Sequence, residues 1–261
     1  MAGADGLARS ASGIGVRPGA GAEYAGAPAA GAAAHAYGTS YTSSAELAAQ
    51  GAAVRGAAVG HAAYTPAMYA SYPRAWNPAN VVTGSLYTHP GYNNLAVGLG
   101  MAAQPVAFDY GGNVVVQNEA VYVNGEAAGT PQQYAAQASL IANAGQAAPP
   151  AQDTKWLPLG IFAVVEGNQT NSNDVFQLAV DQQGVIRGNY HDTANNQVEP
   201  LAGSVDKQTQ RAAWKIGSDQ FPVYEAGIAN LTKDETPMLI HTQDGQTRQL
   251  SLIRLPQPAQ Q

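Results

Sequence analysis

The five histidines are the residues best able to hold a metal or move a proton near neutral pH. They are His35, His61, His89, His191 and His241. No two of them are separated by one or by three residues, the spacings at which neighbouring histidines share a metal ion. The chain also has no cysteine, which excludes thiolate metal sites, disulfides and cysteine nucleophiles. We therefore expect no metal site and no cofactor.

Acidic side chains and two of these histidines fall at predicted turns and strand ends. His191-Asp192 has the letters of a metal-binding pair, but Thr-Ala-Asn-Asn follows it, which is typical of a solvated turn. His241 has the outward phase of its predicted strand, so we expect it on the surface. Further aspartates at predicted turns are Asp174, Asp181, Asp206 and Asp244. Paired catalytic carboxylates need an apolar cleft that shifts one pKa, and the sequence indicates no such cleft.

The run Gly98-Leu-Gly-Met-Ala-Ala103 matches the letters of a dinucleotide-binding turn. Gln104-Pro105 follows where a helix must begin, and no strong strand precedes the run, so we reject this interpretation. The chain contains neither a Gly-x-Ser-x-Gly elbow nor a Walker A sequence. The sequence therefore predicts a protein that is not an enzyme.

Charge argues against binding to nucleic acid, and hydropathy argues against a membrane-spanning helix. The formal net charge is -6 at pH 7, which is the wrong sign for displacing counterions from nucleic acid phosphates. No apolar run approaches roughly 18 residues, so we expect no transmembrane helix. The start, Met1-Ala-Gly-Ala-Asp-Gly-Leu, has an acid and no apolar core, and does not read as a secretory signal peptide. A cytoplasmic protein, a mature form and a start placed too late all remain compatible with it.

Residues 155–256 carry most of the branched aliphatic residues and alternate with a period of two, which predicts β-strands. We expect strands at Leu159–Val165, Val175–Asp181, Val185–His191, Pro200–Val205, Arg211–Ile216, Val223–Ile228, Met238–Thr242 and Thr247–Leu255. Short polar turns between them favour pairing of sequence neighbours. We predict a mainly β fold with a small antiparallel up-and-down β-barrel of six to eight strands, because closure removes the sheet edges. A two-sheet sandwich is the alternative.

Two residues on the dry face of these strands are the candidate ligand-binding residues, Tyr190 and Trp214. Trp214 is expected to fill the core with its indole N–H bonded to a backbone carbonyl; the alternative places both residues inside a ligand cup. We favour a filled interior because the inward set includes bulky Phe, Ile, Leu and Trp. Gly188 in mid-strand suits a bend or bulge at a barrel corner.

Residues 106–145 predict a small β-meander followed by a helix. Val114-Val-Val-Gln and Ala120-Val-Tyr-Val flank a two-residue turn, and Asn124-Gly125 strongly indicates a second hairpin. Thr130, with proline next and Gln133 three residues on, forms a capping box that starts the helix. Gly145 is expected to end it, and residues 146–154, with two prolines, form a linker.

Residues 1–105 predict a low-complexity, mostly disordered region rich in Ala, Gly and Tyr. The first hundred positions hold 28 Ala and 16 Gly, which bury little apolar area per residue. One helix is expected from Ser43, whose capping box with Glu46 precedes an alanine run to about Arg55. Tyrosines and prolines alternate over residues 61–105; we favour a girdle packed around the folded part over an adhesive surface.

Several stretches from Phe108 onward resemble a known family. They are Phe108-Asp-Tyr-Gly-Gly-Asn-Val-Val-Val, Trp156-Leu-Pro-Leu-Gly-Ile-Phe-Ala-Val-Val, Val185-Ile-Arg-Gly-Asn-Tyr, Gly203-Ser-Val-Asp-Lys-Gln-Thr-Gln-Arg-Ala-Ala-Trp and Tyr224-Glu-Ala-Gly-Ile-Ala-Asn-Leu-Thr. Over about residues 108–255 the chain resembles uncharacterised planctomycete proteins labelled mu-protocadherin-like cell-surface proteins. The resemblance implies an exported bacterial protein of the cell envelope or the extracellular space, and supplies no reaction, ligand or catalytic residue.

The sequence and the resemblance together favour a non-enzymatic, envelope-associated or cell-surface structural and interaction protein. Its partner would be an envelope component or another protein. A small-ligand-binding β-barrel of calycin-like architecture is the alternative.

Overall fold

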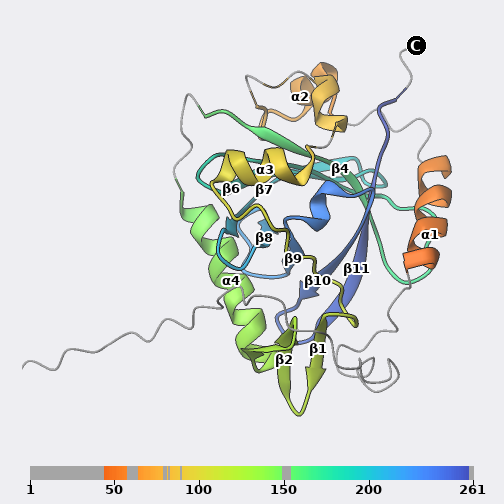
Figure 1. The fold of residues 1–261 in the computed structure, drawn as a ribbon. Coiled ribbons are helices and arrows are strands. Elements are labelled where there is room, and N and C mark those ends of the chain that lie inside the picture. Colours follow the sequence, from red (N-terminus) through yellow and green to blue (C-terminus); the bar gives the residue numbers. More distant parts are fainter. Residues whose placement is uncertain are drawn as a thin grey trace, which may run out of the picture.

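Eight antiparallel strands of the C-terminal half close into a barrel at the centre of the molecule (Figure 1). The computed structural model describes residues 44–57, 64–78, 81, 83–88, 90–148 and 154–258. The barrel strands are β4 (Leu157–Val165), β5 (Asp174–Val180), β6 (Val185–Asp192), β7 (Gln197–Asp206), β8 (Arg211–Ile216), β9 (Val223–Gly227), β10 (Glu235–His241) and β11 (Thr247–Arg254). Each strand pairs with its sequence neighbours, and β11 returns to pair with β4. The up-and-down barrel is confirmed, and the sandwich alternative is wrong.

Side chains fill the interior of the barrel. Alternation along each strand turns one row of residues inward, and the inward rows form a single apolar cluster. Phe162, Phe176 and Trp214 in this cluster are at most 1% exposed. The barrel is therefore a packed core, as the bulky inward residues predict.

Gly188 has a different role from the expected bulge. The register between β5 and β6 runs without a shift through Gly188, and the shift in this sheet lies in β4 between Pro158 and Gly160. A Cβ atom at Gly188 would lie 1.8 Å from the backbone oxygen of Gln177. Glycine is required here because the neighbouring strand leaves no room for a side chain.

Helices of the N-terminal half lie against the barrel. They are α1 (Ser44–Ala57), α2 (Pro66–Ser71), η1 (Thr83–Tyr87, a 3₁₀ helix) and α3 (Tyr92–Leu99). Leu95 and Leu99 of α3 join the core inside the barrel and close one of its ends. The described parts of residues 44–105 are thus packed on the barrel, whereas the sequence predicted a mostly disordered region. Contact with the apolar barrel wall stabilises helices that would fray alone. Residues 1–43 lie outside the described residues.

The expected aromatic girdle is present. Tyr64 is fully buried, and Tyr69 and Tyr72 are partly buried, against the outer faces of β4, β5 and β11. The Tyr64 hydroxyl lies 3.3 Å from the backbone oxygens of both Val175 and Asn189. Packing rather than adhesion is therefore the role of these tyrosines in the structure.

The predicted meander and helix follow α3. The meander consists of β1 (Val114–Gln117), β2 (Ala120–Val123) and β3 (Glu126–Gly129), and α4 (Pro131–Ala147) follows it. Thr130 and Gln133 form the expected capping box. The expected end at Gly145 is wrong, because α4 continues to Ala147 and its C-cap is Ala148. Residues 149–153 of the expected linker lie outside the described residues.

Small residues let α4 approach the barrel closely. Ala138 and Ala142 are fully buried against the barrel wall, while α1 and α4 lie on opposite sides of the barrel (Figure 1). A Cβ atom at Gly145 would lie 1.6 Å from the backbone oxygen of Gly203. Arg187 donates to the oxygens of Gly145 and Ala148 at the C-terminal end of α4, where a cation is favoured by the helix dipole. The helix therefore docks through small residues and a cationic cap.

The meander, α4 and the barrel share their cores. One cluster joins Phe108, Tyr110 and Tyr134 to Leu239 of β10, and another joins α4 to β8. Apolar residues from both sides of the predicted linker at residues 146–154 therefore pack against one another. No helix in that part has the length and apolar character needed to span a bilayer.

Candidate functional site

The two predicted ligand-binding residues meet in an aromatic cluster inside the barrel. Phe176 lies between them, with ring centroids 5.8 Å from Tyr190 and 6.0 Å from Trp214. Tyr224 stacks on Trp214 at 6.3 Å and meets Phe176 edge-on at 5.0 Å. β5, β6, β8 and β9 each supply one of these rings. The alternation of the sequence thus placed Tyr190 and Trp214 on the same face correctly.

The cluster reaches solvent through its tyrosines, at the end of the barrel where β5 begins. The Tyr190 hydroxyl donates to Asp174 Oδ1 at 2.5 Å. Burial, together with this hydrogen bond to Asp174, raises the pKa of Tyr190. Burial also raises the pKa of Tyr224 to about 12, with Asp174 adding to the effect. Both phenols are therefore neutral donors at physiological pH.

Trp214 does not make its expected hydrogen bond. The side chain is completely buried, and its indole nitrogen has no hydrogen-bond partner among the described residues. The prediction of a bond to a backbone carbonyl is wrong, because the indole lies in the apolar interior, where it packs against the rings of Phe176 and Tyr224. An unsatisfied N–H at this depth costs about 1–3 kcal/mol.

A buried charge network lies on the outer wall of the barrel. Glu225 on β9 is fully buried and accepts from Arg211 Nε at 2.8 Å and Nη2 at 2.9 Å. His241 Nε2 lies 2.9 Å from Glu225 Oε2, the same oxygen that accepts from Arg211 Nη2. Burial alone would raise the pKa of Glu225, but Arg211 and His241 lower it to about 2. The expectation that His241 lies on the surface is wrong, since the side chain is 2% exposed.

The same network fastens α4 to the wall. Arg211 donates to the Tyr134 backbone oxygen and to Gln137 Oε1, and its guanidinium lies 3.7 Å from the centre of the Tyr134 ring. On the far side, His241 Nδ1 lies 2.9 Å from Thr247 Oγ1. A hydroxyl, an imidazole and a carboxylate in this order resemble a nucleophilic triad. Here, however, an arginine already neutralises the carboxylate, and the imidazole is enclosed.

Three side-chain amides of the barrel hold the main chain of the N-terminal half. Asn189 accepts from Trp76 N at 2.7 Å and donates to Trp76 O at 2.8 Å. Asn230 does the same with the backbone of Phe108, at 3.1 Å and 2.7 Å.

Gln210 completes the set by accepting from Val106 N at 2.8 Å and donating to Gln104 O at 2.9 Å. Each amide thus offers one donor and one acceptor, as a neighbouring β-strand would. We call Asn189, Gln210 and Asn230 the amide clasps.

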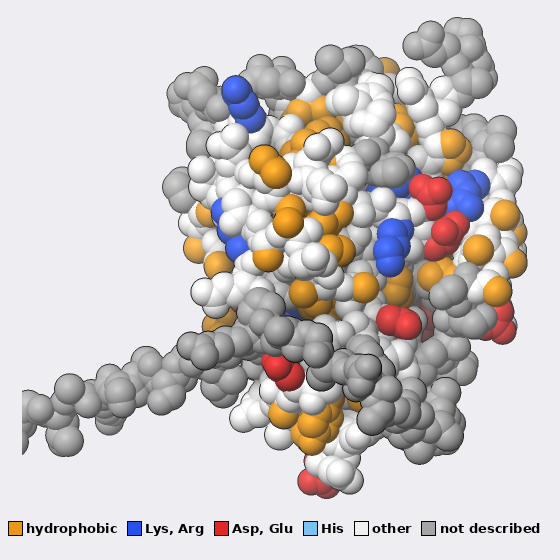
Figure 2. Space-filling view, viewed as in Figure 1, with side chains coloured by type: hydrophobic (Ala, Val, Ile, Leu, Met, Phe, Trp, Pro, Cys, Tyr) orange, Lys and Arg blue, Asp and Glu red, His pale blue; other side chains and the backbone are white. Residues whose placement is uncertain are grey.

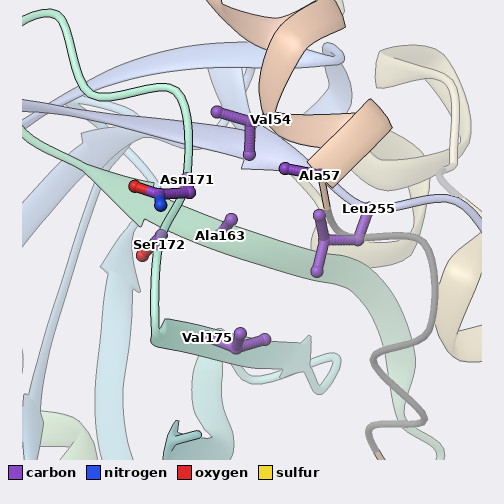
Figure 3. Close-up of a pocket in the computed structure, with 7 residues that line it drawn as sticks. All are labelled: Val54, Ala57, Ala163, Asn171, Ser172, Val175 and Leu255. Carbon is purple, nitrogen blue, oxygen red and sulfur yellow. The ribbon is translucent and has the colours of Figure 1, made fainter. Parts of the chain in front are cut away.

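A small crevice separates α1 from the barrel (Figure 3). Its lining is mainly apolar and consists of Val54, Ala57, Ala163, Asn171, Ser172, Val175 and Leu255. Its volume is about 20 Å³, room for about one water molecule. This gap is too small to serve as a ligand site and marks incomplete packing under α1.

The His191-Asp192 pair does not form a metal site in the described chain. Asp192 accepts from the Ala194 and Asn195 backbone nitrogens, as expected of a turn. The His191 ring lies beside Tyr64 and Tyr72. Within the ranges that the structure describes, no three His, Asp or Glu side chains lie close enough to hold a metal ion.

Sequence reasoning missed the charge network and the amide clasps. The residues of the charge network and Asn189 occupy outward strand positions, where a polar residue predicts solvent. Gln210 lies in the turn between β7 and β8, and Asn230 begins the 3₁₀ helix η2 (Asn230–Thr232). The one available signal was Glu225 itself, a carboxylate flanked by Val223, Tyr224 and Ala226. A charge within such an apolar run suggests a buried partner.

The viewed face of the molecule has no extended patch of one charge (Figure 2). Comparisons with known proteins add no identity: no family model matches the chain, and the searches of curated proteins and of solved structures found no match.

Proposed function

We propose that the protein is a non-enzymatic structural and interaction protein of the cell envelope, in which the barrel is a rigid scaffold for the chain that precedes it. The observation that carries this proposal is the filled barrel whose outer wall holds other chain segments by their main-chain groups. A packed interior is suited to mechanical support rather than transport of a ligand. The resemblance of residues 108–255 to a cell-surface family supports the envelope location.

The absence of catalysis is part of the proposal. Thr247, His241 and Glu225 have the order of a nucleophilic triad, but the bidentate Arg211 removes the charge that would stabilise a protonated imidazole. Treatment of the native chain with a fluorophosphonate probe should therefore leave Thr247 unmodified by mass spectrometry. Labelling of Thr247 that disappears in Glu225→Gln would contradict the proposal.

The location is tested by fractionating cells that produce the protein. The native protein should sediment with the envelope, and its N-terminal sequence reports whether a leader was removed. Purified full-length chain should also bind isolated envelope, with a protein of similar size and charge as the control. Recovery of the native protein in the cytoplasmic fraction, together with no binding to envelope, would overturn the proposal.

A ligand-binding barrel is the second candidate, and one observation favours it. The buried Trp214 indole N–H has no hydrogen-bond partner among the described residues and lies beside the Tyr224 ring, where an acceptor atom of a ligand would satisfy it. A variant with Trp76→Phe and Trp156→Phe leaves Trp214 as the single tryptophan. A shift of its fluorescence with members of a hydrophobic-ligand library would support this function, and a flat response would remove it.

A further inference from the structure

The amide clasps recognise main-chain atoms rather than particular side chains. Asn189 and Asn230 each bond both the N–H and the C=O of one residue, Trp76 and Phe108 respectively. Gln210 spans the oxygen of Gln104 and the nitrogen of Val106. Such contacts need an extended segment in the right place, but they do not need that segment to belong to the same molecule.

The barrel and the N-terminal segment (residues 44–148) each lack something that the other supplies. The wall residues Ile161, Val175 and Ile253 are covered by α1 and the tyrosine girdle. Leu239 is covered by the meander, and Ala213 is covered by α4. In the other direction, the buried side chains of α1, α3 and α4 find their apolar partners on the barrel. The N-terminal segment must therefore dock on a barrel to bury its apolar surface.

The covalent connection between the two parts is short and single. Only residues 149–153, Pro-Pro-Ala-Gln-Asp, join Ala148 to Thr154. Every other contact between the parts is non-covalent. A second copy of the chain has the same N-terminal segment and the same barrel wall. A segment docked on the barrel of the other copy would therefore make the same contacts as a segment docked on its own barrel.

We propose that the N-terminal segment is exchanged between copies, so that a second copy of this chain is a partner of the barrel wall. The segment of each copy docks on the barrel of the other, with the amide clasps holding its main chain. This proposal deepens the proposed function, on which it rests, by naming the partner of an interaction protein. The short linker holds each N-terminal segment near its own barrel at an effective concentration in the millimolar range. Exchange therefore requires a protein concentration near about 1 mM, or two chains that fold together.

The absence of cysteine from the sequence makes a clean crosslinking test possible. Arg55 on α1 and Glu235 on β10 form an ion pair of 2.7 Å, with side chains 30% and 21% exposed. Arg55→Cys and Glu235→Cys are therefore placed in contact across the two parts, and both are reachable by a short bis-maleimide. A chain with both substitutions should crosslink within itself, which sets the efficiency of the reaction.

Exchange is read from two chains that each carry one cysteine. Arg55→Cys and Glu235→Cys chains are unfolded, mixed at about 1 mM, refolded, diluted and crosslinked. We expect a covalent dimer at least fivefold more abundant than after refolding at about 1 µM. Leu140→Cys, 69% exposed on α4, replaces Arg55→Cys as the control and should give no dimer above random collision.

Two results would overturn the proposal. One is a dimer yield that does not exceed the Leu140→Cys control, and the other is a purely monomeric mass by light scattering after refolding at about 1 mM. Envelope binding that persists without dimers would defeat only the exchange, whereas dimers without envelope binding would defeat only the envelope location.

Discussion

Arg211→Met is the substitution that tests the buried charge network most directly. It removes the guanidinium that makes two hydrogen bonds to Glu225 and leaves a fully buried carboxylate beside His241. Breaking a buried pair in this way costs about 3–5 kcal/mol. The substitution also frees the Tyr134 carbonyl and Gln137, so the loss extends to the docking of α4.

The magnitude is checked by urea unfolding of the full chain, followed by circular dichroism. Glu225→Gln in the Arg211→Met background removes the stranded charge, so the double variant should recover about 2–3 kcal/mol relative to the single variant. Arg248→Met is the matched control, because Arg248 and Glu166 form an exposed pair with side chains 41% and 47% accessible. That control should cost less than about 1 kcal/mol.

Two outcomes of the urea measurements would refute a stabilising role for the buried charge network. If Arg211→Met costs no more than Arg248→Met, the network contributes nothing beyond a surface ion pair. If the double variant is as unstable as the two single losses added together, Arg211 and Glu225 are not coupled.

Three further changes test other parts of the structure. Because the folded pKa of Glu225 is about 2, below its ordinary value of 4.5, Glu225 should contribute constant stability above about pH 5 and lose up to about 3 kcal/mol of it as the pH decreases from 4.5 to 2, measured by urea unfolding at each pH. Glu225→Gln is the control and should lose less stability over the same range, through carboxyls such as Asp192 and Asp244, whose pKa values are also lowered. Gly145→Ala should cost about 2–3 kcal/mol and expose α4 to limited proteolysis, because its Cβ would overlap the backbone oxygen of Gly203; an unchanged unfolding midpoint would contradict the close approach. Asn230→Ala should cost about 1–3 kcal/mol, because the buried N–H and C=O of Phe108 lose their partners, and faster amide exchange at Phe108 is the measurement.

The barrel could be predicted from the sequence because its determinants are local. Phe176, Leu178 and Val180 alternate with residues of the other face, and short polar turns leave no room for crossovers. Asn124-Gly125 and the capping box at Thr130 are likewise decided within a few residues. Such features need no knowledge of distant parts of the chain.

The outer wall could not be predicted in the same way. Gln177, Asn189 and Glu225 lie at outward positions of their strands and are nevertheless fully buried. Alternation identifies which face a residue occupies, but not whether α4, the meander or the girdle covers that face. The composition of residues 44–105 suggested disorder because the Ala- and Gly-rich chain has little apolar surface of its own. The barrel wall provides the apolar surface on which this part of the chain packs.

The amide clasps have a consequence for how freely this protein can diverge. Since the clasps bind peptide groups, the exposed side chains of Pro105 and Ala107 can change without weakening the attachment, provided that the chain stays extended there. Substitutions should therefore accumulate in this stretch while the three amides on the barrel stay the same.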